Sequence, residues 1–264
     1  MRPLKNDIEV YFNQVARDRK KRSLSRYYWN DIRDFCSFFS HSDLCVLEIG
    51  CGSGDLLASL PARKKTGVDI SQEQLVWAKE KYPNETIEWV HQDAHQLQLT
   101  ETYDLIILSN LIGFTEDIQL VFENLKPYCH AQTKIIVQYY NSIWEPFLKW
   151  AERLGLKNKS PLQNWLSTRD INNLLVVSGF EVYRNQKRMI VPLYIPLLSK
   201  ICNRFLAHFP PFRFFCWNLY SFARLQPRLE ETETSVSIII PARNEAGNTE
   251  QALLRMPKFG TQQE

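Results

Sequence analysis

The stretch Val46-Leu47-Glu48-Ile49-Gly50-Cys51-Gly52-Ser53-Gly54 decides the fold of this chain. Its apolar residues predict a short strand covered on both faces, because a brief apolar run bounded by glycines is typical of such a strand. Glycines at alternate positions then predict a tight turn, where the backbone bends sharply and a ligand can lie against the main chain. The next residues, 55–58 (DLLA), predict a helix start. The pattern is not the dinucleotide fingerprint G-x-G-x-x-G, because residue 55 is an aspartate.

Three further apolar runs end in polar groups in the same order along the chain. Residues 66–71 (TGVDIS) predict a second strand that ends in Asp69, about twenty residues after the glycines, where a doubly wound fold places a ribose-binding carboxylate. Residues 87–94 predict a third strand ending in Asp93-Ala94, and residues 103–110 a fourth ending in Ser109-Asn110. We therefore expect four strand ends to serve one ligand.

An acid just before the glycines, with a glycine two residues after the second, resembles motif I of class I S-adenosylmethionine-dependent methyltransferases. The resemblance implies a Rossmann-like, doubly wound α/β sheet of seven strands, with S-adenosylmethionine as the cofactor. The cofactor-binding residues that it implies are Glu48, Gly50, Cys51, Gly52, Gly54, Asp69, Ile70, Asp93, Ala94 and Asn110. Two alternatives stay open: Asp69 as the cap of the following helix, and Asp93 as a residue that only orders its own loop.

Methyl transfer requires few catalytic groups, since the protein mainly holds the nucleophile and the methyl group in line. A general base is needed only where a hydroxyl must lose its proton. The catalytic candidates by position are Asn110, Tyr28, Tyr139 and His95, with Tyr140 beside them. Tyr27 and Tyr28 also resemble the aromatic pair that this family brings over its cofactor, with core packing as the alternative. No metal site is expected, because the histidines have no metal-ligand spacing with cysteine.

Composition favours a globular enzyme of a reducing compartment. A net charge of +3 does not call for nucleic acid, and the six cysteines contain no C-x-x-C pair. The sequence lacks a signal-peptide core and an uncharged run of membrane-spanning length. We therefore expect a cytoplasmic enzyme, without a nucleic-acid partner, that methylates a small-molecule, glycan or lipid-linked acceptor.

The organisation along the chain predicts a methyltransferase domain over residues 1–228. It comprises a helical cap (1–40), a core (41–186) and an amphipathic insertion (187–217). Within the insertion, an apolar stripe from Leu197 to Phe209 runs beside Lys200, Arg204 and His208, which are spaced four apart. This pattern predicts a lid helix packed on the sheet or, as the alternative, a helix over residues 193–217 that lies on anionic lipid at the inner face of a membrane.

A second resemblance begins after a predicted linker at 229–234. Residues 235–246 (SVSIIIPARNEA) resemble the opening strand and loop of family 2 glycosyltransferases with a GT-A fold, and Glu245 matches an acid of the nucleotide pocket. The resemblance implies that residues 235–264 are the truncated start of such a domain in a bifunctional protein. The metal-binding D-x-D of that family is absent. Alternatives are a strand that completes the methyltransferase sheet, and a glycosyltransferase-associated domain that binds S-adenosylmethionine without catalysis.

Overall fold

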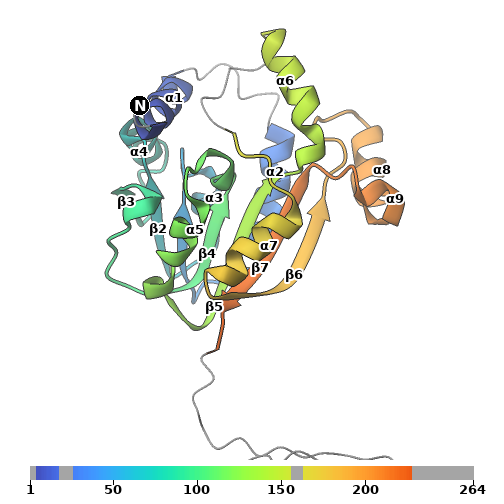
Figure 1. Ribbon diagram of the computed structural model, residues 1–264. Helices are drawn as coiled ribbons and strands as arrows, with labels where there is room; N and C mark the ends of the chain where they lie inside the picture. Colours follow the sequence, from blue (N-terminus) through green and yellow to red (C-terminus); the bar gives the residue numbers. More distant parts are fainter. Residues whose placement is uncertain (1–3, 18–25, 156–162, 228–264) are drawn as a thin grey trace, which may run out of the picture. The chain divides into compact units, whose positions relative to one another are not determined.

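The computed structural model describes residues 4–17, 26–155 and 163–227, without the side chains of residues 4–6, 16 and 17 (Figure 1). The chain divides into the units Met1–Gln226 and Pro227–Glu264, and all the described helices and strands lie in the first. The linker at 229–234 and the predicted glycosyltransferase strand lie outside the described residues.

Seven strands form one sheet in the order β3-β2-β1-β4-β5-β7-β6. β7 runs antiparallel to both β5 and β6, and all the other pairs are parallel. The seven-stranded doubly wound sheet predicted from the sequence is thereby confirmed. The strands are β1 (Cys45–Ile49), β2 (Lys64–Asp69), β3 (Ile87–His91), β4 (Tyr103–Ser109), β5 (Cys129–Tyr140), β6 (Phe180–Arg188) and β7 (Asn218–Leu225).

Side chains of successive strand residues enter two cores on opposite faces of the sheet, as the two-residue period of a strand requires. In β4, Ile106 and Leu108 belong to one core, whereas Leu105 and Ile107 belong to the other. The first core is closed by α5 (Ile118–Glu123) and α7 (Thr168–Val177), and the second by α2 (Arg26–Ser37) and α3 (Asp55–Ser59). Sheet and helices thus make the three layers visible in Figure 1.

Local signals set the helix starts. Ser71 caps α4 (Gln72–Lys81) by accepting the Gln74 N–H, and Ser167 and Asp170 form a capping box at the start of α7. The 3-10 turns are η2 (Ala94–Gln96), η3 (Ile112–Phe114), η4 (Lys126–Tyr128), η5 (Ser142–Trp144) and η6 (Leu206–His208).

The carboxyl edge of the parallel strands gathers segments that are distant in the sequence. Helix α1 (Leu4–Arg17) reaches it: the Ser71 hydroxyl donates to Asn13 at 2.5 Å, and the Phe12 ring meets Phe114 edge-on at 5.1 Å. The amino-terminal helix therefore covers the segments that follow β2 and β4, as expected of a cap.

Residues 139–146 are the end of β5, η5 and the start of α6 (Glu145–Arg153). One stretch differs from the expectation. The stripe in 187–217, predicted as one helix, breaks into α8 (Leu198–Arg204), η6 and α9 (Pro210–Arg213). Two successive prolines, Pro210 and Pro211, supply no backbone N–H, so a continuous helix cannot pass through them.

Candidate active site

The glycine loop between β1 and α3 is tied to the neighbouring strand. The backbone N–H groups of Gly50 and Cys51 both donate to the Val68 carbonyl, at 2.8 and 3.0 Å. Gly52 has φ +51°, and a Cβ placed there would meet no atom within 4 Å. Gly54 has φ +73°, and a Cβ there would collide with the Trp89 ring of β3. Open space for a ligand therefore lies at Gly52, whereas Gly54 is needed for the packing of Trp89.

Asp69 at the end of β2 holds this loop in place. One carboxylate oxygen accepts the Gly52 N–H at 2.7 Å, and the other accepts the Ser71 N–H at 2.8 Å. Burial raises the pKa of Asp69, and these two backbone donors oppose that rise. Asp69 is not the helix cap, since Ser71 has that role, and each of its oxygens keeps lone-pair capacity for a further donor.

Glu48 is buried on β1 and accepts the Leu57 N–H at 3.1 Å. Burial raises the pKa of its carboxyl well above the usual range. Its observed contact therefore stabilises the first turn of α3. Cys51 is buried in the same loop, and burial likewise raises the pKa of its thiol.

Asp93 and His95 form a pair in the turn after β3. Asp93 Oδ1 lies 2.8 Å from His95 Nδ1 and accepts the His95 N–H at 3.0 Å, while His95 Nε2 accepts the Asp117 N–H at 3.3 Å. Both ring nitrogens of His95 are therefore engaged, which does not favour it as a catalytic base. Asp93 thus orders its own loop, and its role toward the cofactor stays a prediction. Beside it, Ala94 is buried, and the Ile70 carbonyl contacts His91 Nε2 at 2.9 Å.

Asn110 ends β4 in the left-handed region, with φ +53°. Its side-chain Oδ1 accepts the Tyr28 hydroxyl at 3.2 Å, and its backbone N–H donates to Gln138 Oε1 at 3.0 Å. Gln138 Nε2 in turn donates to the Tyr28 oxygen at 3.1 Å, which closes a ring of three hydrogen bonds. The buried Asn110 Nδ2 has no partner among the described residues.

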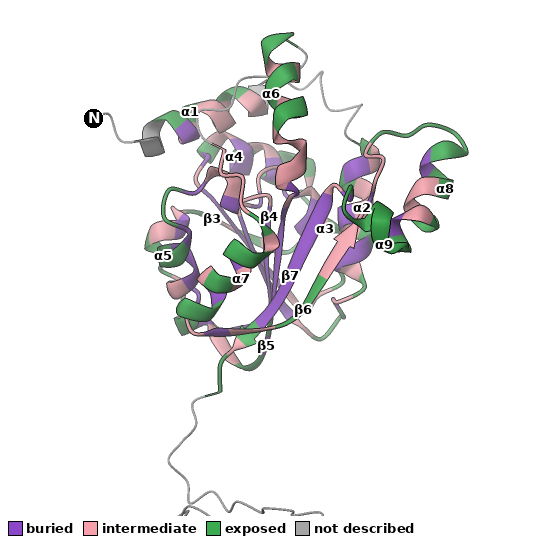
Figure 2. Cartoon of the chain, turned by 45° about the vertical axis from the view of Figure 1, so that its right-hand side comes forward, coloured by how far each residue is buried: buried purple, intermediate pink, exposed green. Residues whose placement is uncertain are grey.

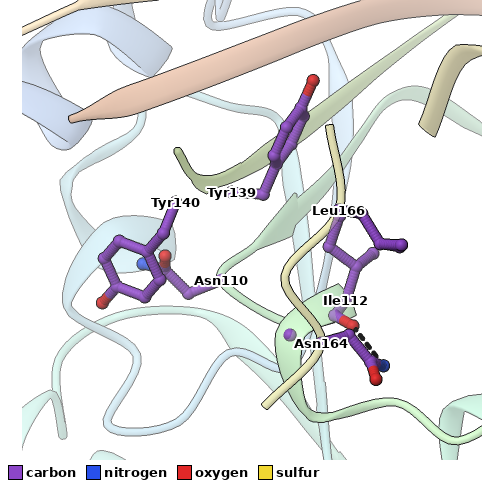
Figure 3. A pocket seen from close by; sticks show the side chains of 7 residues that line it. Asn110, Ile112, Tyr139, Tyr140, Asn164 and Leu166 are labelled. Carbon is purple, nitrogen blue, oxygen red and sulfur yellow. Dashed lines mark hydrogen bonds between the residues drawn. The ribbon is translucent and has the colours of Figure 1, made fainter. Parts of the chain in front are cut away.

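A small pocket adjoins this ring (Figure 3). Asn110, Ile112 and Gly113 line it from the segment after β4, Tyr139 and Tyr140 from the end of β5, and Asn164 and Leu166 from residues 163–167. Asn164 fixes that last segment by donating to the Thr115 carbonyl at 2.6 Å. In Figure 3 the Tyr140 ring lies beside Asn110, whereas Tyr139 points away. The predicted residues Asn110, Tyr28 and Tyr140 thus come together, while His95 is not among the residues of this pocket.

The tyrosines of the site are held neutral. The Tyr28 ring stacks on Tyr140 at 5.8 Å, and burial raises the pKa of Tyr28 well above its ordinary value. Burial also raises the pKa of Tyr140 and of Tyr139, whose hydroxyl contacts Ser221 at 3.2 Å. The expectation of a tyrosine base is therefore not favoured, because burial opposes the phenolate that a base requires.

Three residues of the site were not predicted from the sequence. One of them, Gln138, could have been found, because it is a polar residue inside the apolar run 135–140. Trp89 and Asn164 have none, because their roles depend on packing against Gly54 and on a turn after β4. Among the residues that the structure describes, no cluster of His, Cys, Asp or Glu could hold a metal ion.

Comparison with known proteins places this geometry in a class. Residues 46–130 match the family model described as a methyltransferase domain. The chain is 29% identical over 190 residues to a malonyl-[acyl-carrier protein] O-methyltransferase of Bacillus anthracis, covering 67% of this chain and 68% of that protein. It is 26% identical to the protein of the same description from Priestia megaterium, over 54% of this chain and 56% of the relative.

The fold agrees with a solved methyltransferase structure. Magnesium protoporphyrin IX methyltransferase from Synechocystis PCC 6803, with bound S-adenosylhomocysteine, superposes with a TM-score of 0.60 at 17% identity, over 85% of this chain and all of that one. Sheet order, glycine loop and strand-end acids therefore define a Rossmann-like methyltransferase domain. The chain is an S-adenosylmethionine-dependent methyltransferase, and S-adenosylmethionine is its cofactor.

Proposed function

We propose that the pocket beside Asn110 receives the methyl acceptor and that Asn110 Nδ2 is the donor that orients it. The carrying observation is that this amide nitrogen is buried at the end of β4 and has no partner among the described residues. A buried donor without a partner costs free energy, so such a group at a pocket favours a ligand acceptor.

The ring of hydrogen bonds supports this orientation of the amide. A backbone N–H can only donate a hydrogen bond, so the Gln138 side-chain atom that contacts the Asn110 N–H must be the amide oxygen, Oε1. The amide nitrogen of Gln138, Nε2, therefore faces Tyr28 and donates to its hydroxyl oxygen. The Tyr28 oxygen accepts that bond, which leaves its O–H to donate to Asn110 Oδ1. In this arrangement the Asn110 amide nitrogen keeps its N–H donors for a ligand.

The cofactor residues proposed for this chain are those of the glycine loop and the strand ends. The open space at Gly52 fits a ligand held against the backbone, and Asp69 has acceptor capacity for hydroxyl donors. When bound, the sulfonium supplies a methyl group already activated for displacement. The task of the protein is then to hold the acceptor in line and exclude water.

The pocket favours an acceptor that needs no protein base. The tyrosines nearest to Asn110 are held neutral, so a nucleophile with a free lone pair at neutral pH, such as a carboxylate oxygen or an aromatic amine, suits this site better than an aliphatic hydroxyl. We propose a small-molecule, glycan or lipid-linked acceptor of this kind. The relatives described as malonyl-[acyl-carrier protein] O-methyltransferases make a carrier-bound malonyl group the second candidate.

The test separates cofactor binding from turnover. Isothermal titration with S-adenosylhomocysteine and a product assay should be run on the native chain, Asn110→Ala and Tyr28→Phe, with candidate acceptors including malonyl-acyl carrier protein. Loss of one oriented hydrogen bond is expected to lower kcat/KM roughly tenfold or more. Tyr128→Phe is the matched control, because it removes a buried hydroxyl that lies outside the pocket and donates to the Leu97 carbonyl at 2.8 Å. Unchanged turnover in Asn110→Ala would contradict the proposal.

The glycosyltransferase resemblance of residues 235–264 remains a proposal. Its support is the sequence 235–246 alone, because the family match ends at residue 130.

A further inference from the structure

The segment between β6 and β7 exposes an unusual amount of apolar surface. Of the 22 exposed large apolar residues among those described, 11 lie between residues 193 and 215, with exposed fractions of 42–76%. In Figure 2, α8 and α9 carry mainly the colours of exposed and intermediate residues. The predicted packing of this apolar stripe on the sheet is therefore not observed. The most exposed members are Leu197, Tyr194, Phe205, Phe209 and Phe214.

Two uncharged polar side chains of the same segment, Asn203 and Ser199, fasten it internally. Asn203 accepts the N–H groups of Ile190 and Val191 at 2.8 and 2.9 Å and donates to the Tyr27 hydroxyl at 3.3 Å. The buried Ser199 hydroxyl donates to the Leu193 carbonyl at 2.6 Å. Polar groups are thus satisfied inside while apolar groups face outward, so the arrangement suits an apolar surrounding.

The charged side chains within this segment have one sign. Residues 193–215 contain one lysine and two arginines and no Asp or Glu. Lys200, Arg204 and Arg213 are exposed, and none forms an ion pair with another described residue. Unpaired cations beside aromatic and aliphatic side chains are the combination that anionic lipid attracts, since the rings enter the interface and the cations meet the headgroups.

The surface lies at the same edge of the sheet as the proposed acceptor pocket. β6 runs parallel to β4 and β5, so the segment after Arg188 leaves from their carboxyl edge. Asn141, the residue after Tyr140 of the pocket, holds the segment there. Its side-chain Nδ2 donates to the Phe214 and Cys216 carbonyls at 2.9 and 2.8 Å. The Trp144 ring before α6 also packs on Trp217 at 4.8 Å.

We propose that residues 193–215, with their cations Lys200, Arg204 and Arg213, form a docking surface for a bilayer that carries anionic lipid. In the described part of the chain, no helix has the length and apolar character needed to cross a membrane, so the contact is peripheral. The bilayer then lies against the edge of the sheet at which Asn110 and Tyr140 line the pocket. This inference concerns location and does not depend on the identity of the acceptor.

The test is co-sedimentation of the full chain with vesicles of phosphatidylcholine alone and of phosphatidylcholine mixed with phosphatidylglycerol. The protein should sediment with the mixed vesicles, and binding should weaken as sodium chloride is raised. Each cation near an anionic surface changes partitioning about fivefold, so Lys200→Glu with Arg204→Glu should weaken it by at least about 25-fold. The matched control is Lys126→Glu with Lys134→Glu, exposed cations near the amino end of β5, which should sediment as the native chain does.

The apolar part of the surface is tested by the double variant Phe209→Ser with Phe212→Ser. The control is the double variant Val176→Ser with Val177→Ser, at exposed positions of α7. Only the phenylalanine pair should lose vesicle binding, while the melting temperature and S-adenosylhomocysteine binding of both pairs stay native. Failure of the native chain to sediment at low salt overturns the proposal, as does equal binding by all variants. The proposal is also overturned if the native chain binds no lipid and light scattering shows a dimer that the phenylalanine variant dissociates. That result would assign this surface to contact with a second copy of the chain.

Discussion

The carboxylate of Asp69 accepts the backbone N–H of Gly52 at 2.7 Å, which joins the end of β2 to the loop after β1. The acid expected from the sequence to meet a ribose thus also shapes the loop against which the cofactor is proposed to lie. Because its second oxygen accepts the Ser71 N–H, it fixes the entrance to α4 as well. A change at Asp69 should therefore affect both stability and cofactor binding.

Asp69→Ala is expected to lower the free energy of unfolding by about 1–3 kcal/mol, because two backbone donors lose a charged acceptor. It should also weaken S-adenosylmethionine binding by about 1–3 kcal/mol. Asp104→Ala is the matched control, since Asp104 accepts the Cys45 N–H at 2.7 Å near the opposite ends of β1 and β4. The control should lose stability alone, as measured by chemical denaturation and titration calorimetry. Equal affinity in both variants would contradict a cofactor role for Asp69.

Gly52→Val should abolish S-adenosylmethionine binding, because its side chain fills the open space in the loop. Gly155→Val separates this effect from backbone strain: Gly155 also has a left-handed φ, +72°, and a Cβ there likewise meets no atom within 4 Å. Both variants should lose roughly 1–2 kcal/mol of stability from the left-handed position. Cofactor binding that survives in Gly52→Val, measured by calorimetry, would place the ligand elsewhere.

The Asp93–His95 pair predicts a stability that falls as pH rises. The hydrogen bond with Asp93, at 2.8 Å, raises the pKa of His95 above its ordinary 6.5. The Asp117 N–H donates to His95 Nε2 at 3.3 Å and so favours the neutral ring, but this longer contact is the weaker of the two. The stabilisation is fully present below pH 6.5 and is lost as pH rises through the pKa of the folded state. Denaturation across this range should show the decline, of at most about 1 kcal/mol. Asp93→Asn and His95→Asn should both flatten it; a slope unchanged in either variant would refute the pairing.

Removal of residues 230–264 should leave S-adenosylmethionine binding and the melting temperature unchanged. The seven strands of the sheet all lie before residue 226, so the domain described here does not need the predicted strand at 236–240. Calorimetry and thermal unfolding of the shortened chain give the measurement. A sharply lower melting temperature would show that the tail belongs to the methyltransferase domain and that the boundary at 228 is misplaced.

Much of the fold could be predicted because its determinants are local. The apolar runs at 45–49 and 103–109 become β1 and β4, and Ser71 caps α4, since period, turn glycines and capping chemistry act within a few residues. The α6 helix was not predicted, although its sequence carries local signals: Pro146 in the first turn and apolar residues at helical spacing.

The sequence by itself determined the glycine loop, the acid at the end of β2 and the succession of strands along the chain, because each is encoded by neighbouring residues. Only the tertiary structure decided that Gln138 from β5 and Tyr28 from α2 fix the amide of Asn110, which requires contacts across 28 and 82 residues. It also decided the fate of the apolar stripe in 197–209. Helical periodicity shows that these residues share a face, but only the packing of the whole domain reveals that this face is left exposed.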